Sequence, residues 1–220
     1  MTENWLALNL GNSRLHWAIL QGKTLLDWGD DPYDRLLPLN PHQFHRILIA
    51  SVNPRQLSPW ANLPHSKVLT LADVPLPHSY PTLGIDRALA AWGAIHRYGT
   101  PVLVIDCGTA ITLTAIDELG NLAGGAIFPG IEILRQSYRQ RLPHLPTVPL
   151  PDQPPPLWSH NTPGAIASGM FHFIAAGLHK FINDRSCLTL FTGGDGQYWQ
   201  QHFPSSHFDP HLVFWGMAEL

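Results

Sequence analysis

The sequence carries little charge. Charged residues make up 13% of its 220 residues, while apolar residues make up 45%. A globular chain usually has about a quarter charged residues, so this composition excludes a disordered chain and a solvated coiled coil. The net charge of −3 provides no broad basic surface, and we therefore expect no nucleic-acid partner.

Long apolar runs and a cysteine framework are also missing. No apolar run reaches the roughly 18–20 residues that span a bilayer, and the opening segment MTENWLALNLGN lacks the basic region of a signal peptide. The two cysteines, Cys107 and Cys187, cannot build a disulfide framework. We expect a cytoplasmic protein with no membrane partner.

Several common motifs are absent, whereas turn residues are frequent. The sequence has no Walker A motif, no GxGxxG fingerprint and no GxSxG elbow. It has 21 prolines and 18 glycines, which predict many turns.

Short apolar segments between these turns predict a mixed α/β chain. Helices are predicted at 84–98, at 130–141 and from 163 to 183, and the proline-rich segment 143–163 is predicted to be an exposed loop. Strands are predicted at 5–8, 15–20, 25–28, 47–50, 67–71, 102–105, 111–116, 122–128, 188–192 and 212–215.

The order of these elements indicates an internal repeat. Each half opens with a strand, a small polar turn and two further strands, and then continues into helix and strand. Two copies of one α/β unit, residues 1–99 and 100–220, would place their equivalent turns on the two sides of a cleft. Ligand sites favour such domain interfaces.

Two of the turns have the residues of a phosphate loop. Residues 9–13 (NLGNS) and 106–110 (DCGTA) each combine glycine with small polar side chains after a strand. Backbone N–H groups in such turns can cradle phosphate oxygens, although each turn alone is also typical of a simple hairpin. Asp106 adds a carboxylate at the carboxyl end of a buried strand, which suits a cation or is a local turn former.

Asp86 and Arg87 begin the first long predicted helix. The pair is either an N-terminal charge with a surface ion pair or a general base beside an anion-binding fork. In phosphoryl transfer, an aspartate with an ordinary pKa can accept the hydroxyl proton. Glycine pairs at 124–125 and 193–194 mark two further turns after strands.

Together these motifs resemble the type III pantothenate kinases of the acetate and sugar kinase/Hsp70/actin superfamily. The motifs occur in order over nearly the whole chain: NLGNS, GIDR, DCGTAIT, GGAIFPG, NT and TGG. The resemblance implies two tandem ribonuclease H-like α/β domains around a nucleotide cleft. It also implies ATP-dependent phosphorylation of pantothenate to 4'-phosphopantothenate, the first step of coenzyme A biosynthesis, by a homodimer that uses magnesium with ATP and a monovalent cation, potassium or ammonium.

The resemblance assigns roles to individual residues. Asp86 is the proton acceptor, and Asp106 is the ligand of the monovalent cation. The residues that would bind pantothenate are Tyr80, Gly84, Ile85, Asp86, Arg87 and Thr162. Those that would bind ATP are Asn9, Leu10, Gly11, Asn12, Ser13, Arg14, Leu15, His16 and Thr109.

The first loop departs from the family pattern at both ends. The family has an aspartate where this chain has Asn9, and a lysine near the position of His16. The chain also ends four residues after Gly216, which curtails a closing C-terminal helix.

Two other functions stay open at this point. One is a non-enzymatic relative that acts as an accessory transcription factor, which Asn9 favours. The other is a kinase of the same superfamily that acts on another small alcohol. The presence of Asp86, Arg87 and Asp106 favours the pantothenate kinase.

Overall fold

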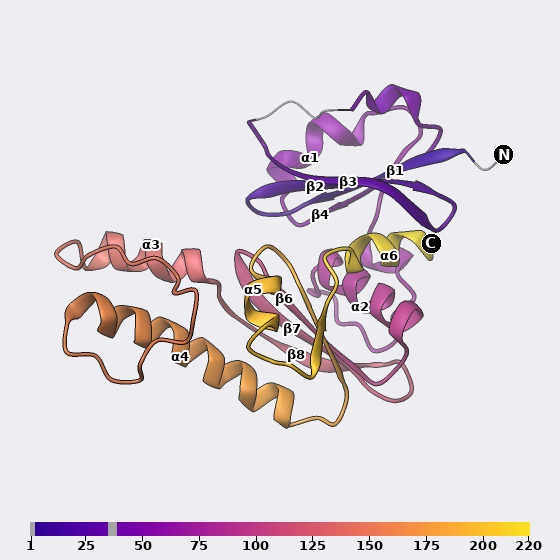
Figure 1. The fold of residues 1–220 in the computed structure, drawn as a ribbon. Helices are drawn as coiled ribbons and strands as arrows, with labels where there is room; N and C mark the ends of the chain where they lie inside the picture. Colours follow the sequence, from indigo (N-terminus) through magenta and orange to yellow (C-terminus); the bar gives the residue numbers. More distant parts are fainter. Residues whose placement is uncertain (1–2, 35–38) are drawn as a thin grey trace.

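The computed structural model describes residues 3–34 and 39–220 and contains two five-stranded sheets (Figure 1). The first sheet lies in the upper part of Figure 1 and the second in the lower part, with two helices between them. The predicted α/β class is confirmed by this arrangement.

The first sheet is built from the first five strands in the order β3-β2-β1-β4-β5. Its strands are β1 Asn4–Leu10, β2 Arg14–Gln21, β3 Thr24–Pro32, β4 Ile47–Ser51 and β5 Ser66–Val68. The first three form an antiparallel meander, while β4 pairs in parallel with β1, and β5 pairs in parallel with β4.

The second sheet repeats this plan with the next five strands. Its order is β10-β9-β6-β7-β8, in which β6 to β8 are an antiparallel meander and β9 and β10 run parallel to β6. The strands are β6 Val102–Cys107, β7 Ala110–Ile116, β8 Leu122–Pro129, β9 Leu188–Thr192 and β10 Ser206–Phe208. The internal repeat predicted from the sequence is therefore present strand for strand.

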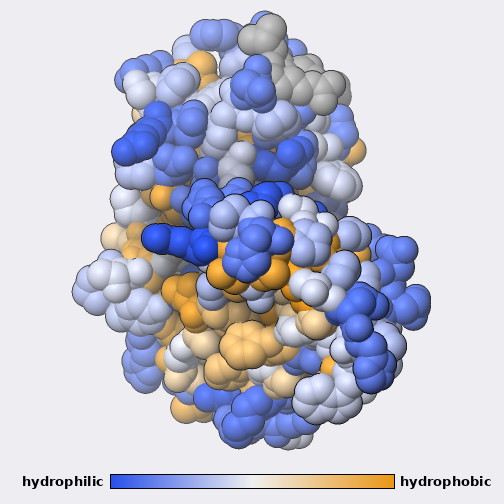
Figure 2. Space-filling view, turned by 90° about the vertical axis from the view of Figure 1, so that its left-hand side faces the viewer, coloured by the Kyte–Doolittle hydropathy of each residue, from blue (hydrophilic) through white to orange (hydrophobic). Residues whose placement is uncertain are grey.

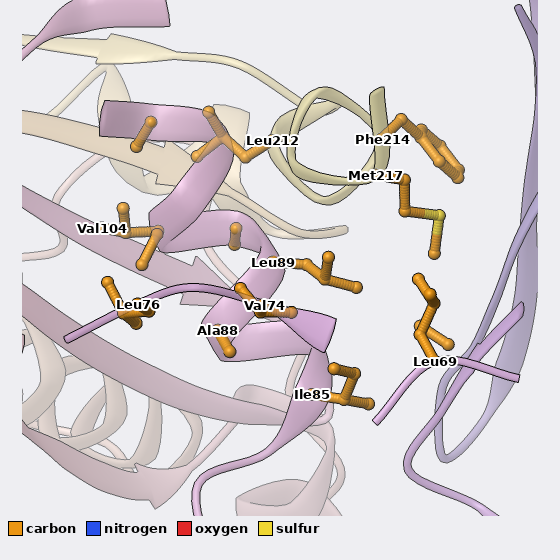
Figure 3. Packing of buried hydrophobic residues seen from close by; sticks show 14 of the residues in the cluster. Leu69, Val74, Leu76, Ile85, Ala88, Leu89, Val104, Leu212, Phe214 and Met217 are labelled. Carbon is orange, nitrogen blue, oxygen red and sulfur yellow. The ribbon is translucent and has the colours of Figure 1, made fainter. Parts of the chain in front are cut away.

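Two helices, α2 (Ile85–Tyr98) and α6 (Leu212–Ala218), lie between the sheets. Figure 3 shows Leu89 of α2 near Met217 of α6, with Leu69 next to Met217. Their close approach depends on glycine, because a Cβ at Gly216 would lie 2.0 Å from the carbonyl oxygen of Leu89. A Cβ at Gly93 would likewise lie 2.2 Å from the carbonyl oxygen of Leu212.

Helix α2 is shared by both halves of the core. It contacts β6 and β7, and its buried cluster also contains Ala7 of β1 and Leu48 of β4. This helix therefore joins the sheets, and the division into domains 1–99 and 100–220 stays a prediction.

The outer face of each sheet has its own cover. Helix α1 (Pro54–Ala61) packs on β4 and β5 of the first sheet. Over the second sheet, α4 (Thr162–Asn183) and α5 (Gly196–Gln200) enclose a core around Phe171, Phe191 and Trp199, and α3 (Ile131–Arg141) follows β8. Two short 3₁₀ helices, Pro41–Gln43 and Leu71–Asp73, complete the elements of the described residues.

One predicted strand is wrong. Residues 212–215 belong to helix α6, and the edge position of the second sheet is taken by β10, which the sequence did not reveal. A short apolar run has the same appearance in a buried strand and in a buried helix. Here the run packs against α2, which selects the helix. The sequence also gave no signal for α1 and α5, and β5 ends at Val68 before the predicted 67–71 segment is complete.

Candidate active site

The turn between β1 and β2 is held by its own backbone and by the core. The N–H of Gly11 donates to the carbonyl of Arg14 at 3.0 Å. Leu10 and Leu15 are buried and anchor the two strand ends, so any contact of theirs with ATP is through the backbone. Asn12 and Ser13 at the tip are exposed.

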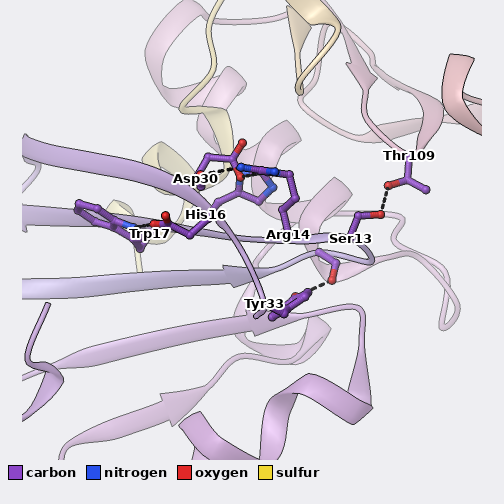
Figure 4. Close-up of polar contacts among 9 residues, drawn as sticks. Ser13, Arg14, His16, Trp17, Asp30, Tyr33 and Thr109 are labelled. Atoms are coloured by element: carbon purple, nitrogen blue, oxygen red, sulfur yellow. Dashed lines mark hydrogen bonds and ion pairs between the residues drawn. The ribbon is translucent and has the colours of Figure 1, made fainter. Parts of the chain in front are cut away.

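Asp30 of β3 contacts two side chains that follow this turn, those of Arg14 and His16. Its Oδ1 accepts from Arg14 Nε at 2.6 Å and lies 3.4 Å from His16 Nδ1 (Figure 4). The ring of His16 faces the turn, since a Cβ on Gly11 would lie 3.8 Å from His16 Nε2. Burial lowers the pKa of His16 below its ordinary value, partly offset by Asp30, so the imidazole is neutral at pH 7.

Tyr33 supports the same turn from below. Its hydroxyl donates to the carbonyl of Gly11 at 2.7 Å, and burial raises its pKa to about 12. Sequence reasoning assigned no role to Tyr33 or Asp30, because only the pairing of β2 with β3 brings them beside the turn.

Asn9, at the end of β1, has a buried amide oxygen with no hydrogen-bond partner among the described residues. An unsatisfied buried acceptor costs about 1–3 kcal/mol. The amide oxygen is therefore available to a donor that binds at this turn, such as a water molecule in the shell of a magnesium ion.

The turn between β6 and β7 is also closed by the N–H of its glycine, although this turn is one residue tighter. The N–H of Gly108 donates to the carbonyl of Ala110, two residues on, at 3.1 Å, whereas Gly11 donates to Arg14, three residues on. The two turns meet, because Ser13 Oγ and Thr109 Oγ1 are 3.0 Å apart (Figure 4). The contact therefore joins one polar turn from each half of the repeat.

Asp106 lies at the end of β6 against glycines of two neighbouring turns. A Cβ on Gly193 would lie 2.3 Å from Asp106 Oδ1, and one on Gly108 would lie 3.2 Å from it. Gly193 also has a φ of +82°, which favours glycine. No hydrogen bond within the described residues reaches the Asp106 carboxylate.

The electrostatics of Asp106 link it to the start of α2. Burial and, to a smaller extent, the charge of Asp86 raise the pKa of Asp106, Arg87 opposes both, and the result is a pKa of about 7. Asp86, Arg87 and Asp106 are thus within electrostatic range of one another.

The segment Gly84–Arg87 is built to present the carboxylate of Asp86. A Cβ on Gly84 would lie 2.5 Å from Asp86 Oδ1, so glycine leaves the space that the carboxylate occupies. Ile85 is buried in the central core, and Asp86 Oδ1 accepts from the N–H of Arg87 at 2.8 Å. Burial raises the pKa of Asp86 above its ordinary value, which corrects the expectation of an ordinary pKa.

Arg87 is 7% exposed and is held by three oxygen atoms. Its Nε donates to Thr114 Oγ1 at 3.1 Å, its Nη2 to the carbonyl of Leu113 at 2.9 Å and its Nη1 to Tyr80 at 3.0 Å. The structure thereby places Tyr80, 40% exposed, beside Arg87. These two predicted substrate residues therefore lie together.

Thr162 is not brought into this group. It is the first residue of α4, exposed and next to the cap residue Asn161, whose Oδ1 accepts from the N–H of Gly164 at 2.8 Å. Figure 1 shows this end of α4 at the left extremity of the molecule, away from the carboxyl end of β6. Within the described part of the chain, no hydrogen bond joins Thr162 to the residues around Asp86.

This arrangement has the parts that phosphoryl transfer needs. One backbone turn from each half meets the other, and the half-buried carboxylates of Asp86 and Asp106 lie within electrostatic range of the buried guanidinium of Arg87. Turns of this kind hold phosphate oxygens, an aspartate can accept a hydroxyl proton, and a carboxylate suits a cation.

Comparison with known proteins agrees with this interpretation. The model of the family described as type III pantothenate kinase matches residues 5–184. A type III pantothenate kinase from Gloeobacter violaceus is 41% identical, with 97% of this chain and 96% of that protein covered.

Two solved structures show the same fold. A protein from Campylobacter jejuni, described as a conserved Baf family transcriptional activator, is 26% identical with a TM-score of 0.74, covering 97% of this chain and 96% of that one. The activator of 2-hydroxyisocaproyl-CoA dehydratase from Clostridium difficile, solved with bound ADPNP, is 9% identical with a TM-score of 0.58, covering 98% and 92% of the two chains. The second likeness shows the shared ATPase fold alone.

Proposed function

The chain belongs to the type III pantothenate kinases, which transfer a phosphoryl group from ATP to pantothenate in coenzyme A biosynthesis, and we propose that this transfer takes place where the turn between β1 and β2 meets the turn between β6 and β7. The observation that carries the proposal is the meeting of Ser13 with Thr109 near Asp106, whose carboxylate is within electrostatic range of Asp86 and Arg87.

Asp86 is the general base of the reaction. The hydroxyl oxygen of pantothenate forms a bond to the γ-phosphorus of ATP, the bond to the departing ADP oxygen breaks, and the hydroxyl proton passes to the Asp86 carboxylate. Burial raises the pKa of this carboxyl, which makes it a stronger base than an exposed aspartate. The hydrogen bond from the N–H of Arg87 to its Oδ1 fixes the carboxylate and leaves Oδ2 for the proton.

Pantothenate is held around the start of α2. The residues that contact it are Tyr80, Gly84, Ile85, Asp86, Arg87 and Thr162, with Arg87 supplying the positive charge for an anionic substrate. The hydrogen bond between Arg87 and Tyr80 supports a shared role for these two side chains. Thr162 rests on the family resemblance alone.

The turn 9–16 and Thr109 bind the phosphates of ATP. Magnesium, which the kinase family implies, fits the first turn because the buried oxygen of Asn9 can accept from a metal-bound water molecule. Bound magnesium would neutralise phosphate charge, while Ser13, His16 and the backbone of the turn orient the phosphates.

Asp106 is the ligand of a monovalent cation, potassium or ammonium. Its Oδ1 lies against Gly108 and Gly193, whose lack of side chains lets the backbone of both turns approach the carboxylate. Within the described residues no donor occupies the carboxylate, so a cation would satisfy it.

A homodimer is supported by exposed apolar side chains at α3, the proline-rich loop and α4. Trp158 is 84% exposed and Phe173 is 78% exposed, and Ile133, Leu142 and Leu157 are also exposed. Figure 2 views the molecule from the end where α3 and α4 lie and shows apolar surface gathered in its lower half. Patches of this kind often mark interfaces, so sedimentation of a Trp158→Ser and Phe173→Ser double variant as a monomer is the expected result.

The protein acts in the cytoplasm, without nucleic acid or a membrane. Within the described residues one helix, α4, has the length and mean hydropathy, 1.3, to cross a membrane. The core helix of a soluble protein has the same properties, and one face of α4 is buried against the second sheet.

One assay tests the whole proposal. ADP release is measured with pantothenate, in potassium and in sodium buffers, for the wild-type protein and for Asp86→Asn. Pantothenate-dependent release that needs Asp86 and rises with potassium is the expected result. Equal release from the two proteins would refute the role of Asp86, and equal release in the two buffers would refute the cation site.

A further inference from the structure

Arg87 is a buried cation without an ion-pair partner. It is 7% exposed, and within the described residues no carboxylate lies within ion-pair distance of its guanidinium. Its three hydrogen bonds go to uncharged oxygens of Thr114, Leu113 and Tyr80. The charges of Asp86 and Asp106 act on this guanidinium only at a distance, so its charge is not neutralised by a direct ion pair. A guanidinium in this state, with a fixed orientation, has the properties of an anion-binding group.

Two of these bonds hold the same edge of the guanidinium. Nε and Nη2 donate to the hydroxyl of Thr114 and to the carbonyl of Leu113, which are adjacent residues of β7. The remaining nitrogen, Nη1, donates to the half-exposed Tyr80. The strand therefore fixes one edge, and the Nη1 side is the one left for a ligand.

The neighbouring strand leaves space for this arrangement. Gly125 of β8 is paired with Thr114 in the sheet register. A Cβ on Gly125 would lie 2.3 Å from Arg87 Nη2 and 2.2 Å from the carbonyl oxygen of Leu113. Glycine at this position is thus required for the guanidinium to reach the β7 backbone.

We propose that Thr114 is a positioning residue for pantothenate, which acts by fixing the guanidinium of Arg87 over the Thr114–Gly125 pair. The inference rests on the proposed role of Arg87 in binding pantothenate. Thr114 itself is 1% exposed and touches Arg87 rather than the substrate. Loss of its hydroxyl frees the Nε edge, so the guanidinium spends less time in the orientation that binds the substrate.

The test compares Thr114→Val with Thr114→Ser. The valine keeps the shape of the side chain and removes the hydroxyl, whereas serine keeps the hydroxyl. Thr114→Val should raise the KM for pantothenate about tenfold and change the KM for Mg-ATP and kcat by less than about twofold, and Thr114→Ser should restore the KM. Thr189→Val is the matched control, because Thr189 is a buried threonine on β9 of the same sheet whose hydroxyl makes no hydrogen bond to Arg87. If Thr114→Val does not fold, the same KM measurements are made on Thr114→Ala, which also lacks the hydroxyl.

Three results would overturn the inference. They are an unchanged KM for pantothenate in Thr114→Val, a serine variant as impaired as the valine variant, and equal changes in the KM values of both substrates. The variant Arg87→Lys distinguishes the positioning role of Thr114 from the role of Arg87 in binding pantothenate. If Arg87→Lys raises the KM for pantothenate and Thr114→Val does not, the positioning role alone is wrong. If neither variant changes it, the role of Arg87 in binding pantothenate is wrong as well.

Discussion

Ser13 and Thr109 are 96 residues apart in the sequence, yet their hydroxyl oxygens lie 3.0 Å apart. Each belongs to the turn after the central strand of its sheet, and the two sheets have the same strand order. The contact is therefore a meeting of the equivalent turns of a duplicated unit. A phosphate group bound between these turns would contact both halves of the molecule at once.

The first prediction concerns Asn9. Its neutral amide can accept from a magnesium-bound water but does not attract the ion by charge, so we expect weak ATP binding, seen as a high KM. Asn9→Asp should lower the KM for Mg-ATP by about tenfold or more, because one charge-assisted contact is worth about 1.5–3 kcal/mol. The measurement is the KM for Mg-ATP of both proteins across a magnesium titration.

An unchanged or higher KM in Asn9→Asp would show that the family's aspartate position does not carry over to this chain. Asn12→Asp is the matched control, since it adds the same charge to the exposed tip of the same turn. A fall in KM confined to position 9 is the expected pattern.

Removal of the Asp106 charge should abolish activation by potassium. In the proposed site the cation would be held by this carboxylate, which lies against Gly108 and Gly193, and an amide in its place would bind a monovalent ion far more weakly. Steady-state rates of wild-type protein and Asp106→Asn are compared in potassium and sodium buffers of equal ionic strength. A potassium response that survives in Asp106→Asn would place the cation elsewhere.

His16 should make ATP binding depend on pH. Burial lowers the pKa of His16, so the free protein has a neutral imidazole at pH 7, facing Asp30 and Arg14. Bound phosphates favour the imidazolium, so binding takes up a proton and the KM for Mg-ATP falls as the pH falls from 8 to 6. One linked proton limits the change to about tenfold per pH unit.

The control for this prediction is His16→Gln, because ATP itself also titrates in this range. The difference between the pH profiles of wild-type protein and His16→Gln reports the histidine alone. Superimposable profiles would exclude a contact between the imidazolium and the phosphates.

The crossing of α2 and α6 should not tolerate a side chain at Gly216. A methyl group there would lie 2.0 Å from the carbonyl oxygen of Leu89, so the helices must separate. Gly216→Ala should lower the free energy of unfolding by about 1–3 kcal/mol. Gly169→Ala on α4 is the control, since a Cβ there meets nothing within 4 Å, and it should stabilise the protein by about 0.4–1 kcal/mol.

Much of this site could be predicted from the sequence because its chemistry lies in contiguous segments. The segment Gly84–Arg87 contains the acid, the guanidinium and the glycine that makes room for the acid. The two turns around Gly11 and Gly108 likewise carry their own closing hydrogen bonds. Short sequence motifs are therefore sufficient to predict the parts of the site in which the interacting backbone and side-chain groups belong to the same few consecutive residues.

The remainder depends on pairings between distant residues. Asp30 and Tyr33 reach the first turn only because β3 pairs with β2, and Thr114 meets Arg87 only because α2 packs on β7. No spacing in a single sequence reveals such contacts. The prediction of a strand at 212–215 is wrong for a related reason. This apolar run suits either a strand or a helix, and the packing of Gly216 against Leu89 selects the helix.

The most direct test of the account is the turnover of Asp86→Asn. The variant keeps the size of the side chain and can still accept from the N–H of Arg87, so pantothenate binding should change little. The kcat of pantothenate-dependent ADP release should fall by roughly 10²–10⁴-fold, with a KM for pantothenate within a few-fold of wild type. Asp184→Asn, at the exposed end of α4, should match the wild-type rate. Near-normal turnover in Asp86→Asn would contradict the account, because the proton would then leave without the carboxylate around which the cleft is arranged.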